Sequence, residues 1–210
     1  RDWTGESKLR IAMEGHGREN ILPNVDISRT VGWFTSMYPV LLEIQKKSGE
    51  LGTAVKTVKD TLGRIPQKGT GYGILKYITK PENKSIQFGG APEIGFNYLG
   101  QFNDTEQQET FSLSGLASGE DITRSWQREQ IIEISALAAE NKLHFNLSYP
   151  PNRFYRKTME HLLNGIQNYL QSIMKHCAGK QETEKTLSDF SSKSLTMEDL
   201  DSISDLVQEL

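Results

Sequence analysis

The sequence is short of several features that would define a class of function. It contains one cysteine, Cys177, in 210 residues, which excludes an internal disulfide and a cysteine-based metal site. No GxSxG or HExxH motif is present, so neither serine-hydrolase nor zinc-protease chemistry is predicted. The four histidines are too dispersed to predict a metal site; they are His16, His144, His161 and His176.

Long apolar runs and a strong positive charge are also missing. No window of eighteen apolar residues exists, and no N-terminal stretch joins positive charge to a hydrophobic run. We therefore expect no membrane span, no signal peptide and a cytoplasmic location. The net charge of −3 excludes a strongly basic surface for nucleic acid. Neither a nucleic acid nor a membrane is an expected partner.

The chain has enough apolar residues to form one hydrophobic core, and its C-terminal tail differs in composition from the rest. Hydrophobic residues make up 36% of the sequence, which is sufficient for a globular domain. Residues 179–210 hold eight acidic and three basic side chains, a net of −5, which leaves +2 for residues 1–178. We predict a domain over 1–178, a flexible linker over 179–194 and an acidic amphipathic helix over 195–210. A strand-like segment follows Arg1 almost at once, so we expect the chain to be cut from a longer protein.

The apolar periodicities predict a mixed α/β (α+β) sandwich. A two-residue period predicts strands over 8–14, 31–44, 94–102, 110–115, 130–139 and 142–150, with a hairpin between the last two. Because proline lacks a donor, Pro39 is expected to end the regular part of the second strand. A helical period predicts helices over 50–62, 69–79 and 156–177.

Glu14 is the most suggestive polar residue, because it ends the first predicted strand and precedes a glycine-framed turn and an apolar segment. In a partly desolvated pocket its pKa would rise, and the carboxyl could carry protons near neutral pH. It could equally be a solvated charge, and the residues alone leave both readings open. His16 in the turn is expected to be structural, held by backbone hydrogen bonds.

Two charge pairs are predicted beside this turn. Arg18 and Glu19 are expected to pair at the surface, where an ion pair stabilises little. Arg29 is expected to form a buried structural pair with Asp26, with a substrate clamp as the alternative.

The last sixteen residues carry an apolar stripe at helical spacing and no basic residue. They form either a solvated, frayed terminus or a docking helix, and we favour a docking helix for a basic partner. The residues expected to make the contact are Leu200, Ile203, Leu206 and Val207.

Four sequence blocks occur in order: EGHGRE (14–19), DISRTVGWFTSMYPV (26–40), GTGYGILKYIT (69–79) and FNYLGQF (96–102). Together they resemble the later core motifs of epimerization domains from bacterial nonribosomal peptide synthetases. The rest of the chain to about Cys177 is compatible with the same domain. A plain condensation domain shares that fold but is not expected to carry EGHGRE followed by SRTVGWFT.

The resemblance implies the C-terminal lobe of a two-lobed fold similar to chloramphenicol acetyltransferase, with a tunnel between the lobes. The implied reaction inverts the α-carbon of an aminoacyl or peptidyl thioester on the 4′-phosphopantetheine of a carrier domain, with no tightly bound cofactor. The implied partners are the upstream carrier domain, the N-terminal lobe and, through the terminal helix, a downstream synthetase subunit.

The resemblance also assigns residues. Glu14 matches the family's catalytic glutamate, whose partner is a histidine of an HHxxxDG motif that this sequence lacks, so the fragment alone is expected to be inactive. Asn97 and Tyr98 match polar site residues that could bond an enolate oxygen. Strand alternation lets only one of these two face the tunnel unless a bulge intervenes, and core packing is the alternative for Tyr98. Candidate substrate-binding residues, for which a structural role is also open, are His16, Ser28, Arg29 and Trp33.

Two other functions remain open from the sequence. One is a condensation-type domain lobe, which would form peptide bonds. The other is a non-catalytic module that docks a carrier domain, in which Glu14 would be inert.

Overall fold

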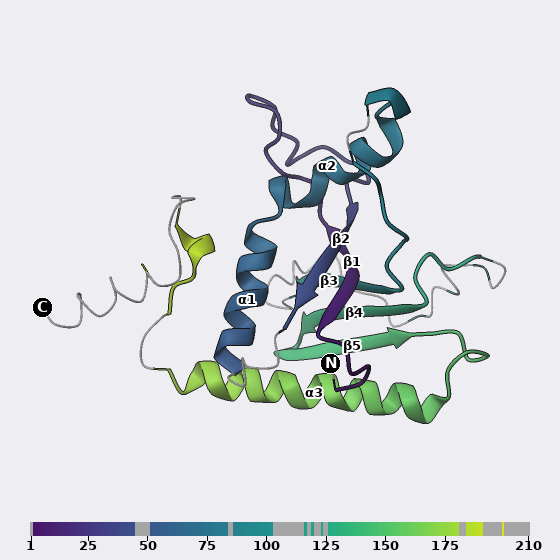
Figure 1. The fold of residues 1–210 in the computed structure, drawn as a ribbon, viewed down its shortest axis with the longest axis vertical. Helices are drawn as coiled ribbons and strands as arrows, with labels where there is room; N and C mark the ends of the chain where they lie inside the picture. The colour runs from purple at the N-terminus through teal and green to yellow at the C-terminus, as the bar shows by residue number, and fades with distance from the viewer. Residues whose placement is uncertain are drawn as a thin grey trace, which may run out of the picture.

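The protein is built on a five-stranded mixed sheet, seen in a computed structural model that describes residues 2–44, 51–83, 86–102, 116, 119, 123, 126–180, 184–190 and 199. The strand order is β2-β1-β3-β4-β5 (Figure 1). The two inner pairs, β1 with β3 and β3 with β4, are parallel, whereas both outer pairs are antiparallel. The strands are β1 (Lys8–Gly15), β2 (Ser36–Glu43), β3 (Ile94–Phe102), β4 (Ile132–Ala139) and β5 (Lys142–Ser148). The predicted mixed α/β class is confirmed.

Two long helices accompany the sheet. In Figure 1, α1 (Leu51–Gly63) lies beside β2, and α3 (Arg156–Ala178) runs along the β5 side of the sheet. The third predicted helix is shorter and irregular: α2 (Thr70–Gly73) continues directly into a π-helical turn, η2 (Ile74–Ile78). Short 3₁₀ turns complete the described elements: η1 (Pro66–Gly69), η3 (Pro81–Asn83) and η5 (Leu187–Asp189). In the described part of the chain, no helix combines the length and the apolar character that a bilayer crossing requires.

The core lies between α1 and one face of the sheet. Ile11, Tyr38 and Val40 are buried there, and Leu62 and Ile65 pack against them. Burying side chains of this size stabilises the fold by about 1.5–3 kcal/mol each. Since strand side chains alternate, the residues between them point to the opposite face.

We call that opposite side the Glu14 face. Its position follows from the strand registers, which pair Ala12 with Gly95, Gly95 with Glu133 and Asn97 with Ser135. Near Glu14 this side of the sheet is more polar than the core side, although Ala12 and Met37 also belong to it. The residues that we assign to it by strand alternation are Arg10, Ala12, Glu14, Met37, Gly95, Asn97, Glu133 and Ser135.

The second predicted strand is confirmed over part of its range, 31–44, but the predictions of its start and of an irregular exit at Pro39 are wrong. Residues 31–35 are not in a strand, and β2 runs from Ser36 through Pro39 to Glu43. Pro39 is tolerated because β2 is an edge strand of the sheet formed by the described residues, where it pairs with β1 and has Ala12 opposite Pro39. An edge strand can turn the position without an N–H toward the open side. The predicted strand over 110–115 lies outside the described residues, as do the four docking residues of the terminal helix.

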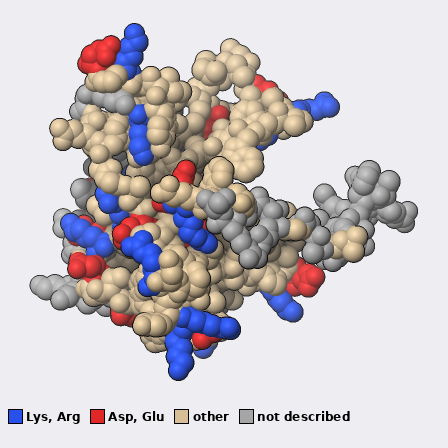
Figure 2. Space-filling model, turned by 90° about the vertical axis from the view of Figure 1, so that its right-hand side faces the viewer, with Lys and Arg blue, Asp and Glu red and all other residues tan. Residues whose placement is uncertain are grey.

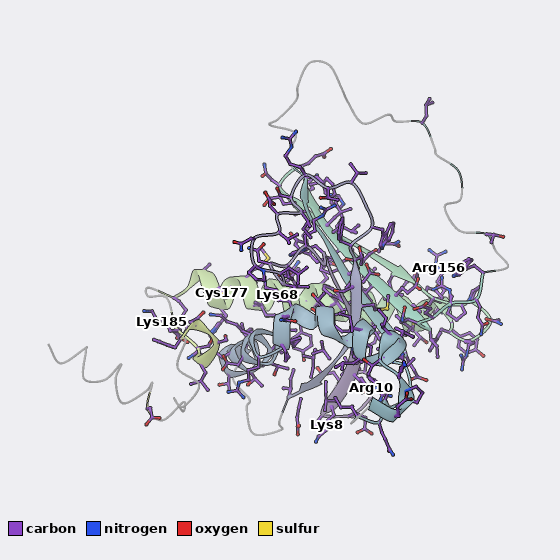
Figure 3. The ribbon with its side chains drawn as sticks, turned by 90° about the horizontal axis from the view of Figure 1, so that it is seen from above. Lys8, Arg10, Lys68, Arg156, Cys177 and Lys185 are labelled. Atoms are coloured by element: carbon purple, nitrogen blue, oxygen red, sulfur yellow. The ribbon has the colours of Figure 1, made fainter. Side chains whose placement is uncertain are left out.

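Part of the predicted flexible linker is packed on the domain. Thr186 is only 1% exposed, and the Ser188 amide donates to Asp60 Oδ1 at 2.9 Å. Lys59 Nζ lies 2.6 Å from Asp189 Oδ2. Figure 3 labels Lys185 within this segment. The polar composition of 184–190 suggested flexibility, but these polar groups have partners on α1.

Removing the Thr186 hydroxyl tests this packing. The Thr186 hydroxyl forms hydrogen bonds with Ser188 Oγ at 3.0 Å and with Asp189 Oδ2 at 3.2 Å. Thr186→Val keeps the shape but loses both bonds, so we expect a loss of about 1–2 kcal/mol in the free energy of unfolding, measured by urea denaturation. Thr57→Val is the control, because Thr57 is exposed and bonds only a carbonyl of its own helix; it should change stability by less than about 0.5 kcal/mol. Equal effects of the two variants would contradict the packing of 184–190.

Candidate functional site

Glu14 and Asn97 meet in the middle of the sheet although 83 residues separate them in sequence. The parallel register of β1 and β3, which pairs Met13 with Phe96, carries them to adjacent positions on the Glu14 face. The Asn97 side-chain amide Nδ2 donates to Glu14 Oε2 at 2.6 Å. The bond fixes one oxygen of the carboxyl group and leaves Oε1 for another partner.

The surroundings of Glu14 favour its neutral form. Partial burial raises its pKa from the ordinary value of 4.5, and the negative charge of Glu133 raises it further. A hydrogen bond from Asn97 acts in the opposite direction, because a donor stabilises the charged carboxylate. The net shift is upward, which moves Glu14 toward the pKa range of a group that exchanges protons near neutral pH.

Glu133 is a neighbour that the sequence did not single out. Its Oε2 lies 3.2 Å from Arg128 Nη1, and Arg128 Nη2 also donates to the Ser148 hydroxyl. Alternation within 130–139 puts Glu133 and Ser135 on one strand face, but only the strand order shows that this face is shared with Glu14. The spacing of residues along the chain therefore could not predict that Glu133 lies near Glu14.

Tyr98 is not brought to Glu14. It pairs with Ala136, a buried residue, and by alternation lies on the opposite face from Asn97. A register shift does occur in β3, but it falls between Tyr98 and Gln101, after the tyrosine. The tyrosine side chain is 52% exposed. Of the two candidates in FNYLGQF, Asn97 is the one that contacts Glu14.

Arg18 closes the loop that follows Glu14. Its guanidinium donates to the carbonyl of Ile27 at 2.7 Å and to that of Gly32 at 3.4 Å, and it lies 4.3 Å from the centre of the Phe34 ring. The predicted surface pair between Arg18 and Glu19 is therefore wrong. The planar, five-donor guanidinium instead ties the two ends of the loop together while stacking on an aromatic ring.

His16 is held as a structural turn residue, as expected. Its Nδ1 accepts the backbone N–H of Arg18 at 3.0 Å, and its Nε2 lies 3.0 Å from Glu19 Oε1. Glu19 also lies 3.5 Å from Lys68 Nζ, so it links the turn to η1. A role of His16 in binding substrate stays a prediction.

The other candidate substrate-binding residues lie on the outside of the same loop. Ser28 and Arg29 are exposed, and Trp33 is 90% exposed. The predicted buried pair of Arg29 with Asp26 is wrong, because Arg29 is exposed and Asp26 Oδ1 accepts the Ser28 N–H at 2.9 Å. That bond lowers the pKa of Asp26. None of the three is shown against Glu14 in the described structure, and their roles in binding remain predictions.

No metal centre is evident in the ranges that the structure describes, where no three His, Cys, Asp or Glu side chains gather into a possible ligand set.

Comparison with known proteins gives the family. The family model for the condensation domain matches residues 1–196. One of the plipastatin synthase subunits of Bacillus subtilis (strain 168) is 72% identical over 209 residues, which are 100% of this chain and 8% of that protein. Bacitracin synthase 2 of Bacillus licheniformis is 41% identical over 203 residues, which are 97% of this chain and 8% of that protein.

Solved structures agree with the family match. The epimerization domain from the third module of tyrocidine synthetase B is 36% identical with a TM-score of 0.77, over 85% of this chain and 40% of that one. A condensation domain that mediates chain release from the enacyloxin polyketide synthase has a TM-score of 0.51 at 12% identity, over 88% of this chain and 35% of that one, which shows the fold alone. The chain thus spans less than half of these solved chains and less than a tenth of these two synthases. It belongs to the condensation domain family.

Proposed function

We propose that the chain is the C-terminal lobe of a nonribosomal peptide synthetase epimerization domain. Such a domain inverts the α-carbon, from L to D, of an aminoacyl or peptidyl thioester on the 4′-phosphopantetheine of a carrier domain. The observation that carries the proposal is the Glu14 carboxyl, half-buried on the polar face of the sheet, bonded by Asn97 and shifted to a higher pKa. The 36% identity to a solved epimerization domain over 85% of the chain supports it.

The chemistry requires a proton to leave one side of the α-carbon and another to arrive on the opposite side. The thioester withdraws electrons from that carbon, so the negative charge left by the departing proton spreads onto the carbonyl oxygen as an enolate. Ionised Glu14 accepts the proton and becomes neutral, and a raised pKa makes this transfer easier. In the reverse direction neutral Glu14 supplies the proton. Asn97 orients the carboxyl by holding Oε2, so that Oε1 can meet the α-hydrogen.

The second proton carrier is expected outside this chain. The family resemblance places a histidine of an HHxxxDG motif across the tunnel, and this sequence contains no such motif. We therefore propose that the chain alone is inactive and acts with an N-terminal lobe and an upstream carrier domain. The proposed downstream partner would dock on the terminal helix.

The test uses the complete domain with an L-aminoacyl or peptidyl carrier domain in deuterated water. Deuterium is expected at the substrate's α-carbon, with the D-isomer accumulating alongside. Formation of a new amide bond without α-exchange would favour the condensation alternative. Carrier binding with neither reaction would favour the non-catalytic docking module.

A further inference from the structure

In the proposed reaction, negative charge develops on the thioester oxygen, and a hydrogen-bond donor is needed to stabilise it. Neither residue predicted for that task is placed for it. The Asn97 amide is engaged by Glu14 Oε2 at 2.6 Å, and Tyr98 lies by alternation on the opposite face of the sheet. On the face that Figure 2 displays, positive and negative side chains are mixed across the middle of the molecule, so the described charges there form no field of one sign. A local donor on the Glu14 face would fill the role.

Gln130 is a buried polar residue that the proposed mechanism does not yet use. It is only 7% exposed, and its amide nitrogen Nε2 donates to the Met37 sulfur at 3.5 Å. A thioether sulfur is a weak acceptor, and the amide makes no other hydrogen bond within the described part of the chain. Burying an amide against a weak partner costs stability, and a role in function would offset that cost.

The bond to Met37 places this amide next to the residue opposite Glu14. Gln130 precedes β4 and Met37 belongs to β2, so the bond reaches across β3 and β1. Met37 is paired with Glu14 in the antiparallel register, and side chains paired in this way share a face, with Cβ atoms about 4.5–5.5 Å apart. Glu14 therefore has Asn97 on one side, on β3, and the Met37–Gln130 contact on the other.

The position of the Gln130 side chain is fixed from below and from its own backbone. A Cβ on Gly95 would lie 3.2 Å from Gln130 Cγ, so the absence of a side chain at Gly95 makes room for the glutamine. The next two amides, those of Ile131 and Ile132, both donate to the Glu93 carbonyl, at 2.8 and 3.0 Å. A donor that is held in place before the charge develops needs no reorganisation during the reaction, which makes its hydrogen bond effective in catalysis.

We infer that Gln130 is a catalytic residue, which donates an N–H to the thioester oxygen as the enolate forms. The inference rests on the proposed function and adds a residue to it. When Glu14 accepts the α-proton, the electrons of the broken C–H bond form a C=C bond, and the carbonyl electron pair moves onto the oxygen that Gln130 bonds. The amide keeps its own protons throughout. An enolate oxygen is a stronger acceptor than the Met37 sulfur, so the bond gains strength as the charge develops.

The test is Gln130→Met in the complete domain, which removes the amide and keeps a flexible side chain of similar length. With the L-aminoacyl or peptidyl carrier domain, we expect kcat for α-carbon deuterium exchange to fall about 100-fold or more, the loss that follows removal of one oxyanion donor. KM should stay within about threefold, and the pH profile should not move, because glutamine does not titrate. Gln127→Met makes the same change at an exposed position three residues away and should keep the wild-type kcat.

Stability gives a second measurement that does not depend on activity. A glutamine with a structural role would lose stability on substitution, whereas replacing a poorly bonded buried amide by an apolar group of similar shape is neutral or stabilising. We therefore expect the urea midpoint of Gln130→Met to lie at or above that of wild type. A kcat equal to that of Gln127→Met would overturn the inference, and so would a loss of kcat accompanied by a lower midpoint. Failure of the proposed function is distinguishable, because the wild-type domain would then exchange no substrate.

Discussion

Glu14→Gln in the complete domain is expected to slow α-carbon exchange by about 100- to 10,000-fold, the range that a general acid or base contributes. Glutamine is nearly isosteric but neither accepts nor releases a proton at neutral pH. Its amide oxygen can still accept the Asn97 Nδ2–H bond that Glu14 Oε2 accepts in the structure, so the local packing should survive. Mass spectrometry of the released amino acid or peptide measures the deuterium.

Glu133→Gln is the matched control for this substitution. It makes the same chemical change on the same face of the sheet, at a carboxyl that raises the pKa of Glu14 but is itself paired with Arg128. We expect the pH profile of exchange to move to lower pH, because the loss of the Glu133 charge lowers the pKa of Glu14. The maximal rate should stay within about threefold of wild type, because Glu14 itself is still present. Full activity in Glu14→Gln would remove Glu14 from the mechanism, whatever the control shows.

The pH dependence of stability separates lost chemistry from lost folding. The pKa of Glu14 is higher in the folded protein than its ordinary 4.5. Below pH 4.5 the group is neutral in both states. As the pH rises through the interval between the two pKa values, the unfolded state releases its proton first, and the folded state is progressively destabilised. Above the folded pKa the penalty is constant. Glu14→Gln should therefore be at least as stable as wild type at pH 7, and the difference should shrink as the pH falls from the folded pKa toward 4.5 and vanish below it.

Local elements of this fold could be predicted from the sequence because their causes are local. The β4–β5 hairpin was predicted at residues 140–142, and its two turn residues, Glu140 and Asn141, both take positive φ angles of 51° and 58°. This is the geometry of a two-residue hairpin. The apolar repeat of α1 was likewise sufficient to place that helix. Turn propensity and apolar periodicity depend on residues that are close together in the chain, so they can be read from one sequence.

The site depends on long-range geometry that spacing does not encode. Glu14 and Asn97 are joined only because the chain leaves β1, forms the β2 edge and returns as a parallel neighbour. The family resemblance identified Asn97 as a site residue. Nothing in the sequence identified Glu133, which lies on the next strand of the sheet. The same limit explains Arg18, whose partners are backbone carbonyls, and the segment 184–190, whose polar groups find α1. The residue type of a polar side chain does not show which group it will contact in the folded protein.

Gly69→Ala is expected to destabilise the protein by about 3–5 kcal/mol, because two penalties act at one position. Gly69 has φ +83°, and a Cβ there would lie 2.1–2.4 Å from ring carbons of Tyr38, which is buried in the core. Gly100→Ala is the control, since Gly100 has φ +96° with nothing within 4 Å of an added Cβ. It should therefore show backbone strain alone, about 1–2 kcal/mol. Urea denaturation of both variants measures the difference, and equal losses would contradict the contact. Because Gly69 is the residue that leads directly into α2, a large difference would show that the close approach of the Tyr38 ring to Gly69 supports the start of this helix.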